Sequence, residues 1–471
     1  MCSMASKHDY DFCVIGAGSA GFAGASIARS LGKSVVIAES TAPLAGLCIL
    51  RGCMPSKTLL RSAEIAHLAA AASRFGIEAG TVRANVPAIV ARKRRIIKEF
   101  ADYRIEAIDN FPMLRGAVAF TGPQQLAVDG HEVRAKKYLI ATGSEISVPK
   151  IPGLLDACYV TSDEVLELEA LPPSVIVLGG GAVACELAQY LRRLGVEVTM
   201  LQRSHTLLSG EDPDVGRALA SALTDEGMQI HTGTKILKVE KSGARKRVHF
   251  ESTGVQMMVE ADEIFVALGR KASVEGLRLD AAGIEYDAAG IHVDGHLRTT
   301  NPDVYAAGDV IKNSTQLVHV AVNEGQIAAR NALSGAGLTI DYDLHGARAV
   351  FTDPQVAIAG LTERECKKRS LDYAMSMFPF DDLGKAIAIG ATKGFIKVLA
   401  ANDGTMLGVA IVGAEASDLI HECIALLYFK ANVRDVMAMP HLHPTLAEIL
   451  TYPAEDLCER LEHEEHALVT P

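Results

Sequence analysis

Residues 10–21, YDFCVIGAGSAG, decide the fold of this chain. The first six are typical of a short buried strand, and the glycines after them lead into a helix of small residues. In this pattern Gly16 makes the tight turn, Gly18 lets a pyrophosphate approach the backbone, and Gly21 lets the helix pack closely on the strand. The stretch therefore predicts a Rossmann-like dinucleotide site, with Ser19 among the cofactor-binding residues of the turn, followed by a helix that begins near Phe22.

The next strand completes this dinucleotide signature. Residues 34–38, SVVIA, have the apolar character of a buried strand, and Glu39 follows them directly. The acid comes roughly twenty residues after the glycines, where a carboxylate accepts hydrogen bonds from a ribose hydroxyl. Strand, glycine turn, helix and terminal acid together are far more specific than three glycines alone.

A second copy of the pattern occupies residues 174–184, SVIVLGGGAVA. Gly179 and Gly181 hold the places of the first two glycines, and an alanine stands at the third, as the motif allows. The strand after this helix ends at Gln202 and Arg203 instead of at an acid. Because no carboxylate repels a 2′-phosphate there and Arg203 can pair with it, the sequence favours NADPH slightly and leaves NADH open. A relic that binds nothing is the alternative.

Two cysteines five residues apart follow the first motif, in residues 46–57, GLCILRGCMPSK. Cys53 precedes a run that predicts a helix with Pro55 in its first turn, and a thiol at the positive end of a helix is biased toward the reactive thiolate. A structural disulfide and a zinc site are the alternatives. The nine cysteines are an odd number, and no second pair or histidine has ligand spacing. The sequence therefore favours a redox pair, Cys48 and Cys53, and predicts no metal site.

The composition is that of an ordinary soluble protein. The 471 residues are 49% hydrophobic, which is enough for roughly two to four domains with substantial cores. A formal net charge of -11 disfavours nucleic acid as a partner. Residues 1–10 contain no apolar core of a signal sequence, and no run approaches about eighteen apolar residues. We therefore expect a cytoplasmic protein that does not bind a membrane.

Two dinucleotide sites and a dithiol imply electron transfer between a nicotinamide, a flavin and a disulfide. Over residues 9–453 the chain resembles the class I flavoprotein disulfide reductases, which include dihydrolipoamide dehydrogenase, glutathione reductase and mercuric reductase. The resemblance implies an α/β fold with two Rossmann-like dinucleotide-binding domains, for FAD and NAD(P), and a C-terminal α+β dimerisation domain. The implied segments are 1–150 for the first part of the FAD-binding domain, 151–270 for the NAD(P)-binding domain, 271–342 for the second, central part of the FAD-binding domain, and 343–471 for dimerisation.

Further motifs carry this resemblance and imply cofactor contacts. Residues 141–144, ATGS, look like the motif that closes the first nucleotide domain, and residues 300–309, TNPDVYAAGD, look like the second flavin motif. Residues 316–321, QLVHVA, are similar to the segment that faces the pyrimidine edge of the flavin, and residues 267–270, ALGR, resemble the strand that closes the nicotinamide domain. The residues implied in cofactor binding are Ala141, Thr142, Gly143, Gly269, Arg270, Gly308, Asp309, Leu317 and His319.

The resemblance also implies roles around the cysteine pair. Cys48 would be the thiol that exchanges with substrate, and Cys53 would pack on the flavin. Lys57 would bind the cofactor near flavin N5 and pair with Glu186, a residue of the second nucleotide helix. A cation held there would favour transfer of electrons to the flavin.

The acid–base chemistry is implied by residues 443–448, HPTLAE. By resemblance, His443 would reach the redox pair of the other chain in a homodimer, and Glu448 would hold its second ring nitrogen. Thiol–disulfide exchange moves protons, so a base that titrates near neutrality is needed beside the attacking sulfur. A carboxylate fixes the tautomer of such a histidine and raises its basicity.

The class of substrate is narrowed by comparing this sequence with the motifs of the family members named above. Leu47 and Leu50 stand where the family has polar residues beside the cysteines, and Arg51 follows them. Glutathione reductases carry an arginine pair in the first helix, where this chain has residues 26–27, SI, and mercuric reductases carry a cysteine pair near the C-terminus, where only Cys458 is found. A small uncharged dithiol/disulfide, such as a protein-bound lipoyl group, remains. Mercuric-reductase-like chemistry, another NADPH-dependent disulfide reductase, a flavin redox sensor and an oxygen-using NAD(P)H oxidase are the alternatives.

Overall fold

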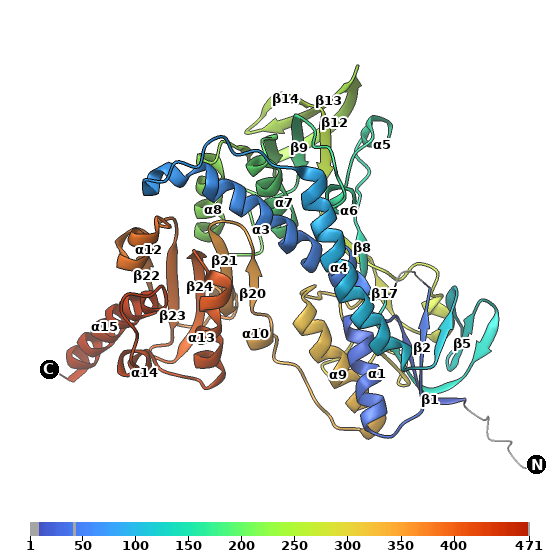
Figure 1. Ribbon diagram of the computed structural model, residues 1–471. Helices are drawn as coiled ribbons and strands as arrows, with labels where there is room; N and C mark the ends of the chain where they lie inside the picture. Colours follow the sequence, from blue (N-terminus) through green and yellow to red (C-terminus); the bar gives the residue numbers. More distant parts are fainter. Residues whose placement is uncertain (1–8, 41–43, 470–471) are drawn as a thin grey trace, which may run out of the picture. The chain divides into compact units, whose positions relative to one another are not determined.

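The computed structural model describes residues 9–40 and 44–469, without the side chains of residues 462–469 (Figure 1). Of the stretch inspected for a signal sequence, residues 1–8 lie outside the described part. The chain forms two compact units, each made of three separate segments. The first unit comprises Met1–Ser56, Ala91–Ser147 and Gly269–His345, and the second comprises Lys57–Val90, Val148–Leu268 and Gly346–Pro471.

The first unit is built on a five-stranded parallel sheet in the order β19-β7-β1-β2-β3. The predicted strand is β1 (Tyr10–Ile15), at the centre of the sheet; α1 (Ser19–Ser30) follows the glycine turn, and β2 (Val35–Glu39) lies beside β1. The predicted Rossmann-like unit is therefore confirmed. The other strands of the sheet are β3 (Met113–Arg115), β7 (Ala135–Ile140) and β19 (Val304–Ala306).

Helices α1 and α9 (Val318–Ser334) pack backbone to backbone in the first unit, side by side in Figure 1. A Cβ on Gly325 would lie 2.1 Å from Ala20 O, so only glycine permits this approach. The smaller elements of the unit are β4 (Val118–Gly122), β5 (Gln125–Val128), β6 (His131–Val133), β8 (Ser144–Ile146), β16 (Arg270–Ala272), β17 (Tyr286–Asp287), β18 (Gly290–Ile291), α2 (Gly46–Leu50) and α10 (Tyr342–His345).

The second unit contains the second nucleotide motif in a four-stranded parallel sheet, β11-β10-β9-β15. The predicted strand, helix and following strand are β9 (Ser174–Leu178), α7 (Ala182–Arg193) and β10 (Glu197–Leu201), which confirms the repeat of the pattern. The remaining elements of this part are α5 (Leu154–Ala157), α6 (Ser162–Val165), α8 (Pro213–Asp225), β11 (Gln229–His231), β15 (Glu263–Val266) and the antiparallel strands β12 (Thr234–Ser242), β13 (Arg245–Ser252) and β14 (Val255–Ala261).

The C-terminal part of the second unit is a five-stranded antiparallel sheet in the order β20-β21-β24-β23-β22. A hairpin joins two of its central strands, because β23 (Phe395–Ala400) and β24 (Met406–Gly413) pair in antiparallel register. The sheet also contains β20 (Arg348–Val350), β21 (Gln355–Gly360) and β22 (Ala374–Pro379), and its helices are α11 (Glu363–Lys368), α12 (Gly384–Ile389), α13 (Ala416–Tyr428), α14 (Val433–Ala438) and α15 (Thr451–Val469).

Helices α3 (Cys53–Ala70) and α4 (Val86–Asp109) each begin in the segments of one unit and end in those of the other. The predicted helix start at Cys53, with Pro55 in the first turn, is confirmed. Compact units and cofactor-binding domains divide the chain differently, so the predicted boundaries near residues 150, 270 and 342 stay a prediction. Among the residues described, no helix combines the length and the apolar character that crossing a bilayer requires.

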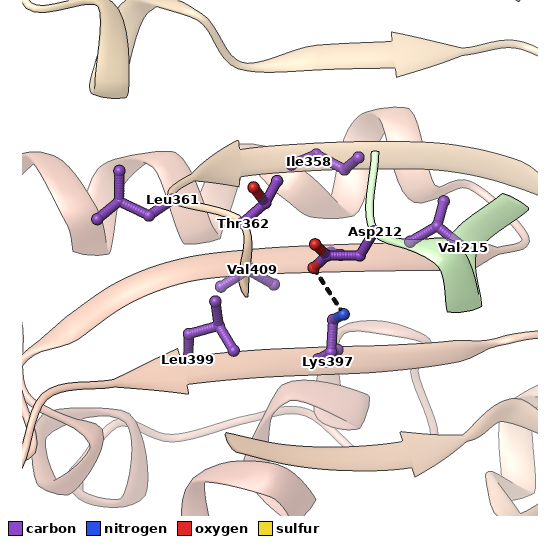
Figure 2. Close-up of a pocket in the computed structure, with 9 residues that line it drawn as sticks. Asp212, Val215, Ile358, Leu361, Thr362, Lys397, Leu399 and Val409 are labelled. Atoms are coloured by element: carbon purple, nitrogen blue, oxygen red, sulfur yellow. Dashed lines mark hydrogen bonds and ion pairs between the residues drawn. The ribbon is translucent and has the colours of Figure 1, made fainter. Parts of the chain in front are cut away.

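A buried ion cluster joins α8 to the antiparallel sheet within the second unit. The side chain of Lys397 on β23 is 2% exposed, and its Nζ lies 2.8 Å from Asp212, 2.8 Å from Asp214 and 3.0 Å from Glu363. Figure 2 shows Lys397 reaching Asp212 across a small pocket. The cavity there holds about 10 Å³, which is roughly the room of one water. The ion cluster therefore has a structural role, and the cavity beside it is too small for a substrate.

Candidate active site

At the first glycine turn the backbone approaches itself too closely for side chains. A Cβ on Gly16, whose φ is +102°, would lie 2.4 Å from Ala141 O, and one on Gly21 would lie 1.9 Å from the carbonyl of Gly16. Gly18 differs, because a Cβ there would meet nothing within 4 Å. Glu39 accepts a hydrogen bond of 2.8 Å from the backbone of the turn. The turn therefore leaves an open place at Gly18 and holds the acid beside it, which fits a dinucleotide.

The motifs of residues 141–144 and 300–309 meet through Ser144 in the first unit. Ser144 Oγ donates a hydrogen bond of 2.7 Å to Asp309 and accepts one of 2.8 Å from Arg270 Nε. Thr142 donates a hydrogen bond of 2.7 Å to the carbonyl of residue 273, which anchors the same loop. Arg270, which the resemblance assigns to the strand closing the nicotinamide domain, contacts this loop within the first unit.

Leu317 is the N-cap of α9, so residues 316–321 contain the start of this helix. The exposed His319, in the first turn, hydrogen-bonds through Nε2 to the carbonyl oxygen of His345 at 3.0 Å. Both residues belong to the first unit. His319 thereby ties the start of α9 to the end of α10.

Glu324, in the second turn of α9, is a buried acid beside the second flavin motif. Its side chain is fully buried; Oε2 accepts a hydrogen bond of 2.7 Å from the N–H of Gly308, and Oε1 accepts one of 2.8 Å from the hydroxyl of Tyr342. Burial raises the pKa of Glu324 to about 7; these two hydrogen bonds oppose the rise, and the nearby charge of Asp309 adds to it. Glu324 therefore changes its charge near neutral pH.

The second glycine turn repeats the geometry of the first. A Cβ on Gly179, whose φ is +120°, would lie 2.3 Å from Ala267 O, whereas one on Gly181 would meet nothing within 4 Å. Gln202 is buried, and its side-chain amide donates to a backbone carbonyl at 3.3 Å. Arg203 is exposed two residues after the end of β10. The open place at Gly181 fits a second dinucleotide, and Arg203 has the exposure that contact with a phosphate requires.

In the loop of residues 46–57 the backbone folds back, so that the residue before Cys53 packs against Cys48. Cys48 lies on α2, and a Cβ on Gly52 would lie 3.1 Å from its Cα. Cys53 follows Gly52 directly, begins α3 and is exposed, whereas Cys48 is half-buried. Burial raises the pKa of the Cys13 and Cys423 thiols to about 12, so these two stay protonated. The redox role of Cys48 and Cys53 stays a prediction.

The structure forms the predicted ion pair between Lys57 and Glu186. Lys57 Nζ lies 2.7 Å from Glu186 Oε2, and the Glu186 side chain is 4% exposed. The N–H of Phe351 donates a hydrogen bond of 2.9 Å to the other carboxylate oxygen, and the Lys57 ammonium lies 4.5 Å from the centre of the Phe351 ring. Lys57 lies four positions after Cys53, so the two share one face of α3.

The predicted hydrogen bond between His443 and Glu448 is also formed. His443 Nδ1 lies 3.0 Å from Glu448 Oε2, and Glu448 is buried. This contact leaves Nε2 as the ring nitrogen that Glu448 does not hold. His441 instead bonds Glu422 on α13 at 2.9 Å, in agreement with a structural role. The catalytic role of His443 stays a prediction.

Sequence reasoning missed Glu324 and Phe351. Glu324 could have been suspected, because it lies three residues after Ala321 and four before Ala328, on the buried face of α9. No local signal marks Phe351, since its partner Glu186 is 165 residues away. A contact of that range is visible only in the folded chain.

The sequence pattern of the pyridine nucleotide-disulphide oxidoreductases matches residues 10–325, and that of their dimerisation domain matches residues 347–454. The chain belongs to this family. Oxidoreductases of the family use FAD and NAD(P)H, and the dimerisation domain supports a homodimer. The two open glycine turns fit these two dinucleotides.

Two relatives of the oxidoreductase have the same sequence identity to it and carry different names. A mercuric reductase of Bacillus cereus is 35% identical over 447 residues, which cover 94% of this chain and 70% of the relative. A dihydrolipoyl dehydrogenase of Thermus scotoductus is 35% identical over 460 residues, which cover 96% and 98%. The solved HOCl-induced flavoprotein disulfide reductase RclA of Escherichia coli has 24% identity and a TM-score of 0.82 over 95% of this chain and 99% of its own. That likeness confirms the predicted α/β fold.

Proposed function

We propose that this oxidoreductase transfers electrons between NAD(P)H and a small, uncharged dithiol/disulfide of the lipoamide type through Cys48 and Cys53. The net reaction is NAD(P)H + H⁺ + disulfide ⇌ NAD(P)⁺ + dithiol. A charged tripeptide disulfide would need an arginine fork, which the first helix lacks. A lipoyl group on a carrier protein has the required chemistry. We also propose that residues 1–150 and 271–342 bind FAD, 151–270 bind NAD(P), and 343–471 dimerise.

The observation that carries this proposal is the hydrogen bond between His443 and Glu448. When a disulfide opens, each sulfur that leaves must take up a proton, and an oriented histidine supplies it. Reduction of a metal ion has no such requirement. A buried carboxylate that holds one ring nitrogen of an exposed histidine is therefore more useful to a disulfide reductase than to a metal reductase.

The chain's own groups would act in the following order during disulfide reduction. The Cys48 thiolate attacks one substrate sulfur, a mixed disulfide forms, and the other substrate sulfur leaves with a proton from His443 of the second chain. Cys53 then attacks the sulfur of Cys48, so the second substrate thiol leaves, again protonated, and a Cys48–Cys53 disulfide forms. His443 regains its proton from solvent between the steps. Bound FAD supplies the two-electron transfer from NAD(P)H to that disulfide.

Reduction of a mercuric ion is the second candidate, because relatives of that name are 35% identical to the chain. In this reaction Hg²⁺ takes both electrons of NAD(P)H and leaves as the metal. A soft ion of this kind needs thiolates that deliver it to the redox pair. Near the C-terminus the sequence has the single Cys458, which is half-buried on α15. This argues against delivery by a cysteine pair.

The deciding experiment is steady-state turnover of the purified FAD-bound homodimer. NADH and NADPH are each paired with lipoamide, oxidised glutathione and mercuric ion. We expect turnover with lipoamide and its loss in Cys48→Ser. Turnover with mercuric ion alone would establish the second candidate. No turnover with any of the three acceptors would contradict the proposal and favour a redox sensor. Oxygen consumption that is unchanged in Cys48→Ser would favour an oxidase.

The choice of coenzyme gives a separate prediction. Arg203 is exposed two residues after the end of β10, where its charge can pair with the 2′-phosphate of NADPH. We expect Arg203→Ala to raise the KM for NADPH about tenfold, because a charge-assisted contact contributes roughly 1.5 kcal/mol, and to leave the KM for NADH within about twofold. Equal effects on both coenzymes would show that Arg203 does not read the phosphate.

A further inference from the structure

One face of α7 fixes the loop that leads into β21. Glu186, Gln189 and Arg193 are spaced by three and four residues, so they line the same face of the helix. Glu186 accepts the N–H of Phe351; Gln189 donates to Asp353 O and accepts its N–H, both at 2.8 Å; and Arg193 reaches the Asp353 carboxylate at 2.6 Å. The loop is therefore held at successive points along the helix.

This attachment places the Phe351 ring against Lys57. The ammonium of Lys57 lies 4.5 Å from the ring centre and 2.7 Å from Glu186 Oε2, while the backbone of Phe351 binds the other carboxylate oxygen. Lys57, Glu186 and Phe351 thus form a closed triangle of contacts. A cation 4.5 Å from an aromatic ring is attracted to the face of the ring.

Lys57 needs such a second contact. The lysine side chain has four rotatable bonds, and the Lys57 side chain is 31% exposed, so one ion pair leaves it considerable freedom. Glu186 cannot follow a moving ammonium, because it is buried and its other carboxylate oxygen accepts the N–H of Phe351. The ring contacts the ammonium on a second side and restricts the positions that Nζ can take.

We propose that Phe351 is a positioning residue for the redox centre and acts through Lys57, whose ammonium its ring and its backbone N–H hold on Glu186. The proposal rests on the proposed function, in which Lys57 serves the cysteine pair and the cofactor. The catalytic lysine, one turn after Cys53, is thereby held by a residue from the C-terminal part of the second unit.

The test compares Phe351→Leu with Phe351→Tyr in the FAD-bound homodimer. Leucine keeps apolar bulk and the backbone N–H but removes the ring, whereas tyrosine keeps the ring. The first readout is the rate at which trace acetic anhydride modifies Lys57, measured by mass spectrometry. The buried Lys397 serves as an internal control for folding. The second readout is the midpoint potential of the bound flavin, measured also in Lys57→Met and in Lys57→Met combined with Phe351→Leu.

We expect Lys57 to be modified about threefold faster in Phe351→Leu, which is the order of one cation–π contact, and at the wild-type rate in Phe351→Tyr. We expect Phe351→Leu to shift the flavin potential when Lys57 is present and to have no further effect in Lys57→Met. Equal labelling of the leucine and tyrosine variants, or an equal potential shift with and without Lys57, would overturn the proposal. Neither readout uses a disulfide, so failure of turnover with lipoamide would be a separate result.

Discussion

At the scale of single residues, the contrast between His443 and Glu448 explains how the histidine can exchange protons. The His443 side chain is 78% exposed, whereas that of Glu448 is 11% exposed. The Glu448 carboxylate is buried and cannot move into solvent with the ring. Because a carboxylate only accepts hydrogen bonds, it fixes the tautomer of His443 in which Nδ1 carries the proton. The ring is then ready to give or take a proton at Nε2.

This geometry predicts unequal effects of two isosteric changes. We expect His443→Gln to lower kcat with lipoamide about a hundredfold or more, because the acid–base group is lost. We expect Glu448→Gln to lower kcat about tenfold, because the amide oxygen can accept from the ring but carries no charge to raise its basicity, while the ring itself is kept. Both variants should keep the rate at which NAD(P)H reduces the bound flavin, measured by stopped flow. Loss of that rate as well would assign the pair to folding or cofactor binding.

Glu324 makes the stability of the first unit depend on pH. Burial raises the pKa of this carboxyl from 4.5 to about 7, although the hydrogen bonds from Tyr342 and Gly308 oppose the rise. Between these two pH values the folded chain keeps a proton that the unfolded chain releases. The free energy of unfolding therefore falls as pH rises from 4.5 to 7, and the loss is complete above pH 7.

We expect Glu324→Gln to remove this dependence. The amide keeps an acceptor for the Gly308 N–H and can donate to the Tyr342 oxygen, but it carries no charge. At pH 8 the variant should be more stable than the wild type by up to about 3 kcal/mol, and at pH 4.5 the two should be equal. Calorimetric unfolding at both pH values measures the difference. A constant difference between the two proteins would show that Glu324 does not titrate in this range.

At the scale of elements, the strand–turn–helix unit separates glycines needed by the fold from glycines needed by a ligand. A Cβ on Gly21 would lie 1.9 Å from the carbonyl oxygen of Gly16, whereas Gly18 has open space and a φ of −66° that alanine adopts freely. The same motif therefore contains one steric glycine and one ligand-facing glycine. Only the first is required by the protein alone.

Alanine at Gly18 should impair FAD binding, whereas alanine at Gly21 should impair folding. We expect Gly18→Ala to fold with wild-type helix content, because nothing in the protein obstructs the new methyl group, and to lose most of its FAD. We expect Gly21→Ala to express poorly or unfold, since its methyl group would overlap the carbonyl of Gly16. Circular dichroism and the flavin absorbance of the purified proteins decide the matter. If the Gly18→Ala protein retained its full content of FAD, the pyrophosphate would not bind against Gly18.

How far the sequence predicts an element depends on whether its cause is local. The strands at residues 10–15 and 174–178, their glycine turns and the helix start at Cys53 follow from apolar runs, backbone freedom and a proline position within a few residues. The pairing of Lys57 with Glu186 was reached only through resemblance. The aromatic contact on Lys57 was not reached, because it depends on how a distant loop attaches to α7.

At the scale of the whole molecule, large apolar side chains are exposed in the dimerisation domain, which also contains His443. Leu442, directly before His443, is 77% exposed, and Phe429 at the end of α13 is 78% exposed. The dimerisation domain of the family supports a homodimer, so the surface that carries His443 fits a contact with the other chain.

Mixed dimers test whether each active site takes Cys48 from one chain and His443 from the other. Two differently tagged chains are coexpressed and the heterodimer is purified. With Cys48→Ser in one chain and His443→Gln in the other, a site shared between chains leaves one intact site, so we expect roughly half the wild-type turnover with lipoamide. With both changes in one chain and a wild-type partner, each site has one defect, so we expect almost none. If each chain contained its own complete site, the heterodimer with one change in each chain would have almost no turnover, and the heterodimer with both changes in one chain would keep about half. Which of the two heterodimers is the more active therefore decides the question.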